Sequence, residues 1–156
     1  MIKYFFIWLL LLTLIMCESA QKKIATKPIV FKKEGEVILL NRDKDSMASF
    51  DIELATTDYE RQTGMMYRTE MQPNQGMLFV FEKAEPKSFY MKNTPLSLDI
   101  LFVDEAKEIF QIVEKALPNS LENINSEAPA KYVLELLGGQ VQSLQIERGF
   151  HIEIIQ

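Results

Sequence analysis

Alternating apolar and polar residues mark one segment of the chain as a β-strand. Phe50, Ile52 and Leu54 alternate with polar or small residues, which is the period of a strand with one buried face. The apolar run 77–81, Met-Leu-Phe-Val-Phe, directly follows the turn residues 73–76. A run of this length beside a turn predicts a central strand that is buried on both faces, with Phe79 in its middle.

Shorter patterns of the same kind predict the remaining elements. Strands are expected at residues 37–40, 88–92, 96–103, 108–113, 131–136 and 151–155. Thr57 and Glu60 have the spacing of a capping box and predict a short helix, and a second helical stretch follows Gly138-Gly139. Because most connections between strands are short and polar, neighbouring strands are expected to be antiparallel. The sequence therefore predicts a mainly β, compact antiparallel sandwich or barrel-like domain with one or two short helices.

The first 17 residues are typical of a secretory signal peptide. Lys3 precedes a nearly unbroken apolar run over residues 4–16, which is too short to cross the roughly 30 Å hydrocarbon core as a helix. The run ends at Cys17, and residues 14–17 resemble the lipobox of bacterial lipoproteins. We therefore predict a lipid on Cys17, export to the cell envelope, and the membrane as one partner. The alternatives are an uncleaved membrane anchor and cleavage shortly after Cys17, for example behind Ser19 or Ala20, which would release the domain.

Residues 18–35 are polar, Lys-rich and aperiodic, as in a flexible tether, so the folded domain is expected over residues 36–156.

The chain has 17 Lys and Arg residues against 22 Asp and Glu residues, a net charge of −5. Without a basic excess, nucleic acid is not an expected partner. One Cys and one His, His151, cannot form an intramolecular disulfide or a four-ligand zinc site. The sequence also has no nucleotide-binding or nucleophile motif, so no cofactor is expected.

Two acidic residues lie in apolar segments and therefore need a partner or a raised pKa. They are Asp99, within residues 96–103, and Glu135, within residues 132–137. The polar residues that complete a candidate ligand site with them are Arg68, Lys92, Asn93 and Thr94. One hypothesis makes Asp99 and Glu135 the acid and base of a carboxylate-based hydrolase or transferase. The other, which we favour, places them in a structural ion-pair network, with Asp99 paired to Arg68 or Lys92.

Six methionines follow the signal segment, and all of them lie between residues 47 and 91. Thioethers are soft ligands that select Cu(I), and Met65, Met77 and Met91 are the candidate ligands of such a site. No His supports a mixed site, and Met also fills irregular cores. We therefore favour packing over metal binding for these residues.

Five motifs together resemble the domain of unknown function 192 (DUF192) family. They are Gly64-Met65-Met66-Tyr67-Arg68 and residues 76–81, 89–94, 98–104 and 132–136. The resemblance covers about residues 50–155, with agreement in order and spacing. It implies a single mainly β, sandwich-like domain that is often exported behind a signal. It implies no reaction, because the family is itself uncharacterised.

We therefore expect an exported, lipid-anchored and non-catalytic binding or accessory module of the cell envelope, with a small ligand, a glycan or a protein as its partner. The carboxylate-based enzyme and a Met-rich Cu(I)-binding accessory protein are the alternatives. The positions of Asp99 and Glu135 distinguish the first two hypotheses. Convergence in an open cleft would favour chemistry, whereas pairing inside a closed core would favour structure.

Overall fold

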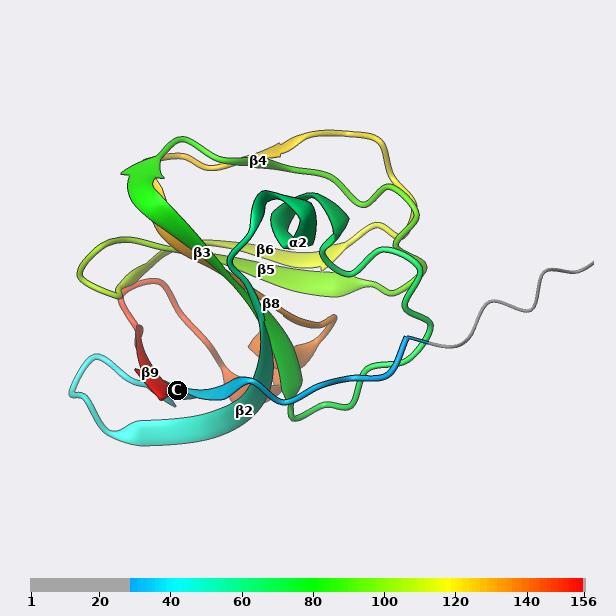
Figure 1. Ribbon diagram of the computed structural model, residues 1–156. Helices are drawn as coiled ribbons and strands as arrows, with labels where there is room; N and C mark the ends of the chain where they lie inside the picture. Colours follow the sequence, from blue (N-terminus) through cyan, green and yellow to red (C-terminus); the bar gives the residue numbers. More distant parts are fainter. Residues whose placement is uncertain (1–28, 156) are drawn as a thin grey trace, which may run out of the picture.

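The computed structural model describes residues 29–155, which fold into one curved seven-stranded sheet, a two-stranded ribbon and two short helices (Figure 1). The elements are β1 (Gly35–Leu40), β2 (Ser46–Ala55), α2 (Asp58–Thr63), β3 (Gln75–Glu85), β4 (Ser88–Phe89), β5 (Leu98–Val103), β6 (Ile109–Ala116), β7 (Ile124–Asn125), β8 (Ala130–Leu137), α3 (Gln140–Leu144) and β9 (His151–Ile155). The predicted mainly β architecture with one or two short helices is confirmed.

The order of strands in the large sheet is β6-β5-β8-β3-β2-β1-β9, so β3 is its middle strand. This agrees with the central strand predicted from residues 77–81. Five of the six neighbouring pairs are antiparallel, and β2–β3 alone is parallel. A parallel pair needs a crossover connection, which residues 56–74 supply by way of α2.

The two edges of the large sheet, β6 and β9, approach each other at one end. Glu108 and His151 form a bridge, Ile109 N donates to Phe150 O at 2.8 Å, and Ile152 N donates to Lys107 O at 3.0 Å. The strands share no longer ladder in the described residues. The sheet is therefore curled in a barrel-like manner without forming a closed barrel.

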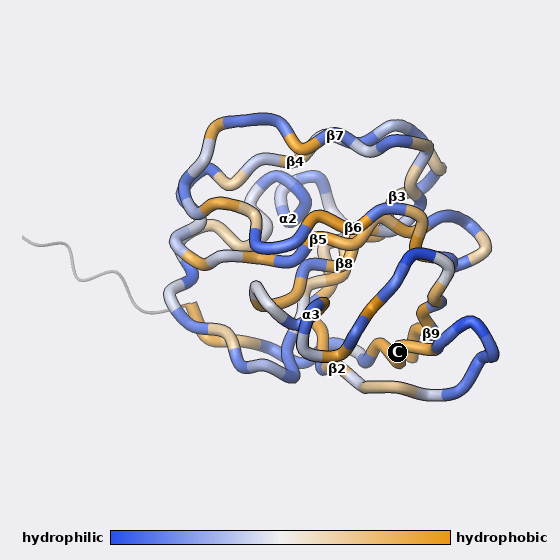
Figure 2. Tube along the Cα trace, turned by 180° about the vertical axis from the view of Figure 1, so that it is seen from behind, coloured by the Kyte–Doolittle hydropathy of each residue, from blue (hydrophilic) through white to orange (hydrophobic). Residues whose placement is uncertain are grey.

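Both faces of the middle strands are buried, because successive side chains of a strand point to opposite faces. The inner cluster lies within the curl of the sheet and consists of Val37, Leu39, Phe50, Ile52, Leu78, Leu101, Val103, Ile109, Leu134, Leu136, Val141, Ile146, Phe150 and Ile152. The outer cluster lies on the opposite face and consists of Ala55, Met65, Met77, Phe79, Met91, Leu98, Ile100, Phe102, Ala116, Ala130 and Val133. Figure 2 shows the corresponding strands as mostly hydrophobic and the loops as mostly hydrophilic. Phe79 is 1% exposed, as predicted.

Helix α2 and the β4–β7 ribbon lie together on one side of the large sheet (Figure 1). The predicted capping box begins α2: Glu60 N donates to Thr57 Oγ1 at 3.2 Å, and Thr57 N donates to Glu60 Oε2 at 2.8 Å. The backbone amides of Thr57 and Thr56 both donate to Glu60 Oε2, and they lower the pKa of Glu60 to about 2. Gly64 ends the helix with φ +46°, and a Cβ there would lie 3.0 Å from the Phe79 ring. Glycine thus lets the chain turn closely over the outer cluster.

The residues just before β1 already form hydrogen bonds with the large sheet. Lys32 N donates to Glu53 Oε1 at 2.9 Å, and Glu34 N donates to Ile52 O at 2.8 Å, so the end of the predicted tether runs beside β2. The predicted signal peptide and Cys17 lie outside the described residues. Within residues 29–155, neither helix has the length and apolarity needed to cross a membrane.

Candidate functional site: a cavity around Glu135

A cavity of about 210 Å³ lies over the outer face of β3 and β8, beneath α2 and the segment that carries β4. Its walls are mostly apolar and include Phe79, Phe89, Met65 and Met91. The rings of Phe79 and Phe89 meet edge to face with their centroids 5.0 Å apart, which fixes one wall. The cavity is therefore mostly apolar, and α2, β3, β8 and the segment that carries β4 all contribute to its walls.

Glu135 is the buried acid of this cavity. It lies on β8 between Met77 of β3 and Ile100 of β5 in the register of the sheet, and it is 5% exposed. Within the described chain its Oε2 atom has no hydrogen-bond partner. Burial raises the pKa of Glu135 to about 8, because the ionised form would lose its hydration. At neutral pH the carboxyl is mostly protonated and can both donate and accept a hydrogen bond.

Two cationic side chains also line the cavity, and they differ in how far they are already engaged. The Arg61 guanidinium donates to Val80 O at 3.1 Å and to Thr56 O, and it pairs with Asp58 at 2.6 Å. Lys87 Nζ lies 4.0 Å from the centroid of the Phe81 ring and 3.5 Å from a Glu85 oxygen. Arg61 therefore ties α2 to the sheet, whereas Lys87 keeps donors for a bound molecule.

Asp99 does not belong to this site. The cross-strand pairs Asp99–Leu136 and Ile100–Glu135 place the two acids on opposite faces of the sheet. Asp99 is fully buried and accepts hydrogen bonds from three backbone amides, Lys115 N at 2.7 Å, Gly139 N at 2.9 Å and Val141 N at 2.8 Å. The predicted pairing with Arg68 or Lys92 is therefore wrong. Backbone donors of β6 and of the turn into α3 satisfy the carboxylate instead.

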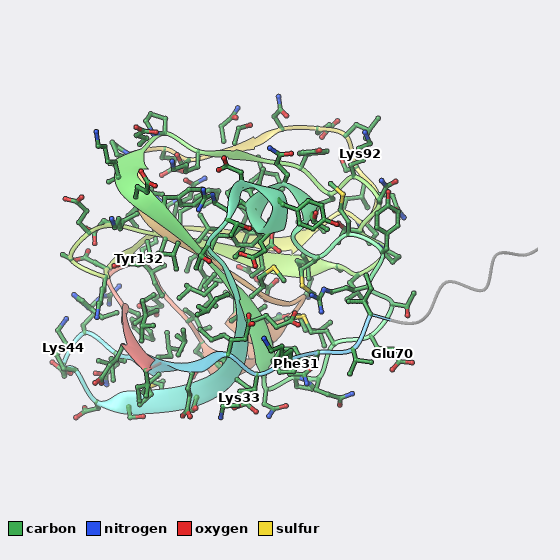
Figure 3. The ribbon with its side chains drawn as sticks, viewed as in Figure 1. Phe31, Lys33, Lys44, Glu70, Lys92 and Tyr132 are labelled. Atoms are coloured by element: carbon green, nitrogen blue, oxygen red, sulfur yellow. The ribbon has the colours of Figure 1, made fainter. Side chains whose placement is uncertain are left out.

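The other predicted ligand-binding residues are not brought together. Arg68 pairs with Glu53 at 2.6 Å, and both side chains are nearly buried. Asn93 Nδ2 donates to Tyr67 Oη at 2.7 Å, and Tyr67 N donates to Asn93 O at 2.8 Å, which locks two loops together. Lys92 is exposed at the periphery (Figure 3).

Among the predicted polar ligand-binding residues, Thr94 alone shares the cavity with Glu135, and it is 4% exposed. The sequence did not single out Arg61, Lys87, Phe89 or Met66, which also line it. Phe89 and Met66 lie in motifs that carried the family resemblance, but nothing local in the sequence marks Arg61 or Lys87. Arg61 and Lys87 reach the cavity only because α2 and the segment that carries β4 fold onto the same face of the large sheet.

The candidate copper ligands Met65, Met77 and Met91 are all buried in the outer cluster. Met65 and Met91 line the cavity together with Met66, whereas Met77 lines a neighbouring hollow beside Glu53 and Arg68. Between residues 29 and 155 there is no group of three or more His, Cys, Asp or Glu residues that could hold a metal ion. Any metal site at the cavity would therefore depend on thioethers.

Comparisons with known proteins agree with the resemblance. The model of the DUF192 family, described as "Uncharacterized ACR", matches residues 39–154. A crystal structure from Sinorhizobium meliloti 1021, described as a "putative transcription regulator", is 37% identical with a TM-score of 0.75, and the match covers 82% of this chain and 98% of that one. A protein of unknown function from Novosphingobium aromaticivorans DSM 12444 is 31% identical with a TM-score of 0.73, over 83% of this chain and 94% of that one. No curated protein matches the sequence.

Proposed function

The chain belongs to the DUF192 family, and we propose that its domain is a non-catalytic binding module that holds a small molecule in the Glu135 cavity. The observation that carries this proposal is a buried carboxyl that has no hydrogen-bond partner in the described chain and lies at a mostly apolar cavity. Buried polar groups are normally hydrogen-bonded, and leaving one without a partner costs about 1–3 kcal/mol. A ligand that hydrogen-bonds to Glu135 would recover that free energy.

The arrangement favours binding over catalysis. The proposed acid and base, Asp99 and Glu135, lie on opposite faces of the sheet, and Asp99 is already satisfied by three amides. His151, on β9, has its Nε2 3.8 Å from a Glu108 oxygen and does not line the cavity. Among the described residues, the cavity lining therefore holds no second carboxyl and no imidazole to act with Glu135 as an acid–base pair.

The proposal includes export and a lipid anchor at Cys17, supported by the apolar run that ends at the only cysteine of the chain. The acidic balance of the chain, 22 Asp and Glu against 17 Lys and Arg, favours a small-molecule module over a nucleic-acid reader. The regulator description of the Sinorhizobium protein concerns that protein.

A second candidate ligand of the same cavity is Cu(I). The observation that favours it is the presence of three methionines, Met65, Met66 and Met91, around one cavity, since thioethers select this ion. Titration with Cu(I) under reducing conditions, in competition with a chelator, tests this candidate. Binding that survives replacement of both Met65 and Met91 by Leu would exclude it.

Isolation of the protein from its own membranes tests the binding proposal. Native mass spectrometry of the wild-type protein should reveal a bound small molecule. Met66→Trp should lose it, because the indole fills the rim of the cavity, whereas Met47→Trp should keep it, because Met47 lies on β2 and does not line the cavity. Equal occupancy in the two variants would contradict the proposal.

A further inference from the structure

We infer that the Glu135 cavity selects a small monocarboxylate with a compact apolar body, an inference that rests on the proposed binding function. The inference is based on the size of the cavity, the unpartnered Glu135 carboxyl on the sheet side of the cavity, and Lys87 in the cavity wall. Each of them restricts the chemistry of the ligand in a different way.

The size of the cavity sets the apolar body. An apolar cavity of roughly 150 Å³ is known to accept benzene. The Glu135 cavity, at about 210 Å³, therefore has room for one six-membered ring with a small planar substituent. Phe79, Phe89, Met65 and Met91 provide walls that suit a ring or a short branched chain.

The polar groups set the head group. A protonated Glu135 offers one O–H donor, and a carboxylate is its strongest acceptor because the hydrogen bond is then charge-assisted. Lys87 offers an ammonium to the same carboxylate, since it lines the cavity and its contact with Glu85 is 3.5 Å long. A neutral amide could accept from Glu135 but would gain less from Lys87. A cationic ligand would be repelled by Lys87 and Arg61, which carry the same sign of charge.

Few charged groups lie close enough to Glu135 to affect its protonation. Arg61 of α2, Lys87 before β4 and Tyr90 after β4 are the other titratable or charged residues of the cavity lining. The flanking residues in the sheet, Met77 and Ile100, are uncharged. On the far side of Met77, Glu53 and Arg68 neutralise each other. Burial therefore governs the ionisation of Glu135.

This arrangement makes carboxylate binding dependent on pH. With the pKa of Glu135 at about 8, the donor form is almost complete at pH 6 and falls to about a tenth at pH 9. Because apparent affinity scales with the fraction of the binding-competent form, carboxylate affinity should fall about tenfold over this range. A cationic ligand would show the opposite trend, because it would favour ionised Glu135.

Isothermal titration with benzoate, benzamide and benzamidinium tests the inference, since the three share a size and shape and carry charges of −1, 0 and +1. The wild-type protein should bind benzoate most tightly at pH 6 and about tenfold more weakly at pH 9. Glu135→Gln should remove the pH dependence, because an amide donates at both pH values. Lys87→Met should weaken the binding of benzoate severalfold and the binding of benzamide much less. The exposed control Glu70→Gln should behave as wild type.

The outcomes separate the ligand class from the binding function. Preference for benzamidinium, or benzoate binding that is equally tight at pH 6 and pH 9, would overturn the monocarboxylate inference. If benzamide then still bound to the wild type and not to Met66→Trp, the proposed binding function would stand. If none of the three compounds bound in a manner sensitive to Met66→Trp, both the inference and the proposed function would fail.

Discussion

Glu135→Gln should stabilise the protein increasingly as the pH rises, and the size of the effect follows from the burial of this side chain. The substitution keeps the shape of the side chain and removes its ionisation. In the folded protein the carboxyl has a pKa of about 8, whereas in the unfolded chain it returns to its ordinary value of 4.5. Below pH 4.5 the carboxyl is neutral in both states, so wild type and variant differ little there.

Between pH 4.5 and pH 8 the unfolded chain releases its proton and the folded chain retains it. The unfolded state then binds fewer protons than the folded state, so the free energy of unfolding falls by about 1.4 kcal/mol per pH unit. The slope is smaller close to each pKa, so from pH 5 to pH 8 the wild type should lose about 3.5 kcal/mol relative to Glu135→Gln. Above pH 8 the difference should level off, because both states are ionised.

Urea unfolding of the two proteins at each pH from 5 to 9 measures this difference. Contributions of other acids, such as Glu60 with its pKa of about 2, are common to both proteins and cancel. Glu70→Gln, at an exposed position, is the matched control and should give no pH-dependent difference. A constant gap between wild type and Glu135→Gln from pH 5 to pH 8 would refute the reasoning, since it would show that Glu135 is solvated or paired.

Three further substitutions test other parts of the account. Asp99→Asn should lower the free energy of unfolding by about 2–4 kcal/mol at pH 7, because one amide oxygen cannot accept from three buried backbone donors. A urea titration in which the variant is as stable as the wild type would contradict this. Phe79→Ala should cost about 3–5 kcal/mol, as is usual for a buried Phe, and a thermal or urea measurement below about 1 kcal/mol would show that the outer cluster does not depend on it. Cys17→Ser should move the protein from the detergent-requiring membrane fraction to the soluble fraction, and an unchanged distribution would rule out a lipid on Cys17 as the main anchor.

The sequence was sufficient where a local pattern decides the structure. The run 77–81 identified the middle strand β3, and the spacing of Thr57 and Glu60 identified the start of α2. The apolar neighbours of Glu135 correctly indicated that it is buried. In each case the pattern reports burial or capping, which depends on residues close together in the chain.

The sequence was insufficient where distant segments meet. The parallel pairing of β2 with β3 depends on the crossover through α2, which alternation within strands does not reveal. The partners of Asp99 are backbone amides, and any residue type supplies a backbone amide, so no side-chain signal pointed to them. The cavity joins α2, the β4 segment and β8, so Lys87 and Arg61 became candidates only after folding.

The most direct test of ligand binding in the Glu135 cavity is an NMR titration of the protein labelled with ¹³C at its methionine methyl groups, with benzamide as the probe. Met65, Met66 and Met91 line the cavity, whereas Met47 on β2 lies outside it and serves as an internal control. We predict saturable shifts of the three cavity resonances and none at Met47. Shifts spread equally over all four, or absent from the cavity methionines at saturating probe, would contradict the account.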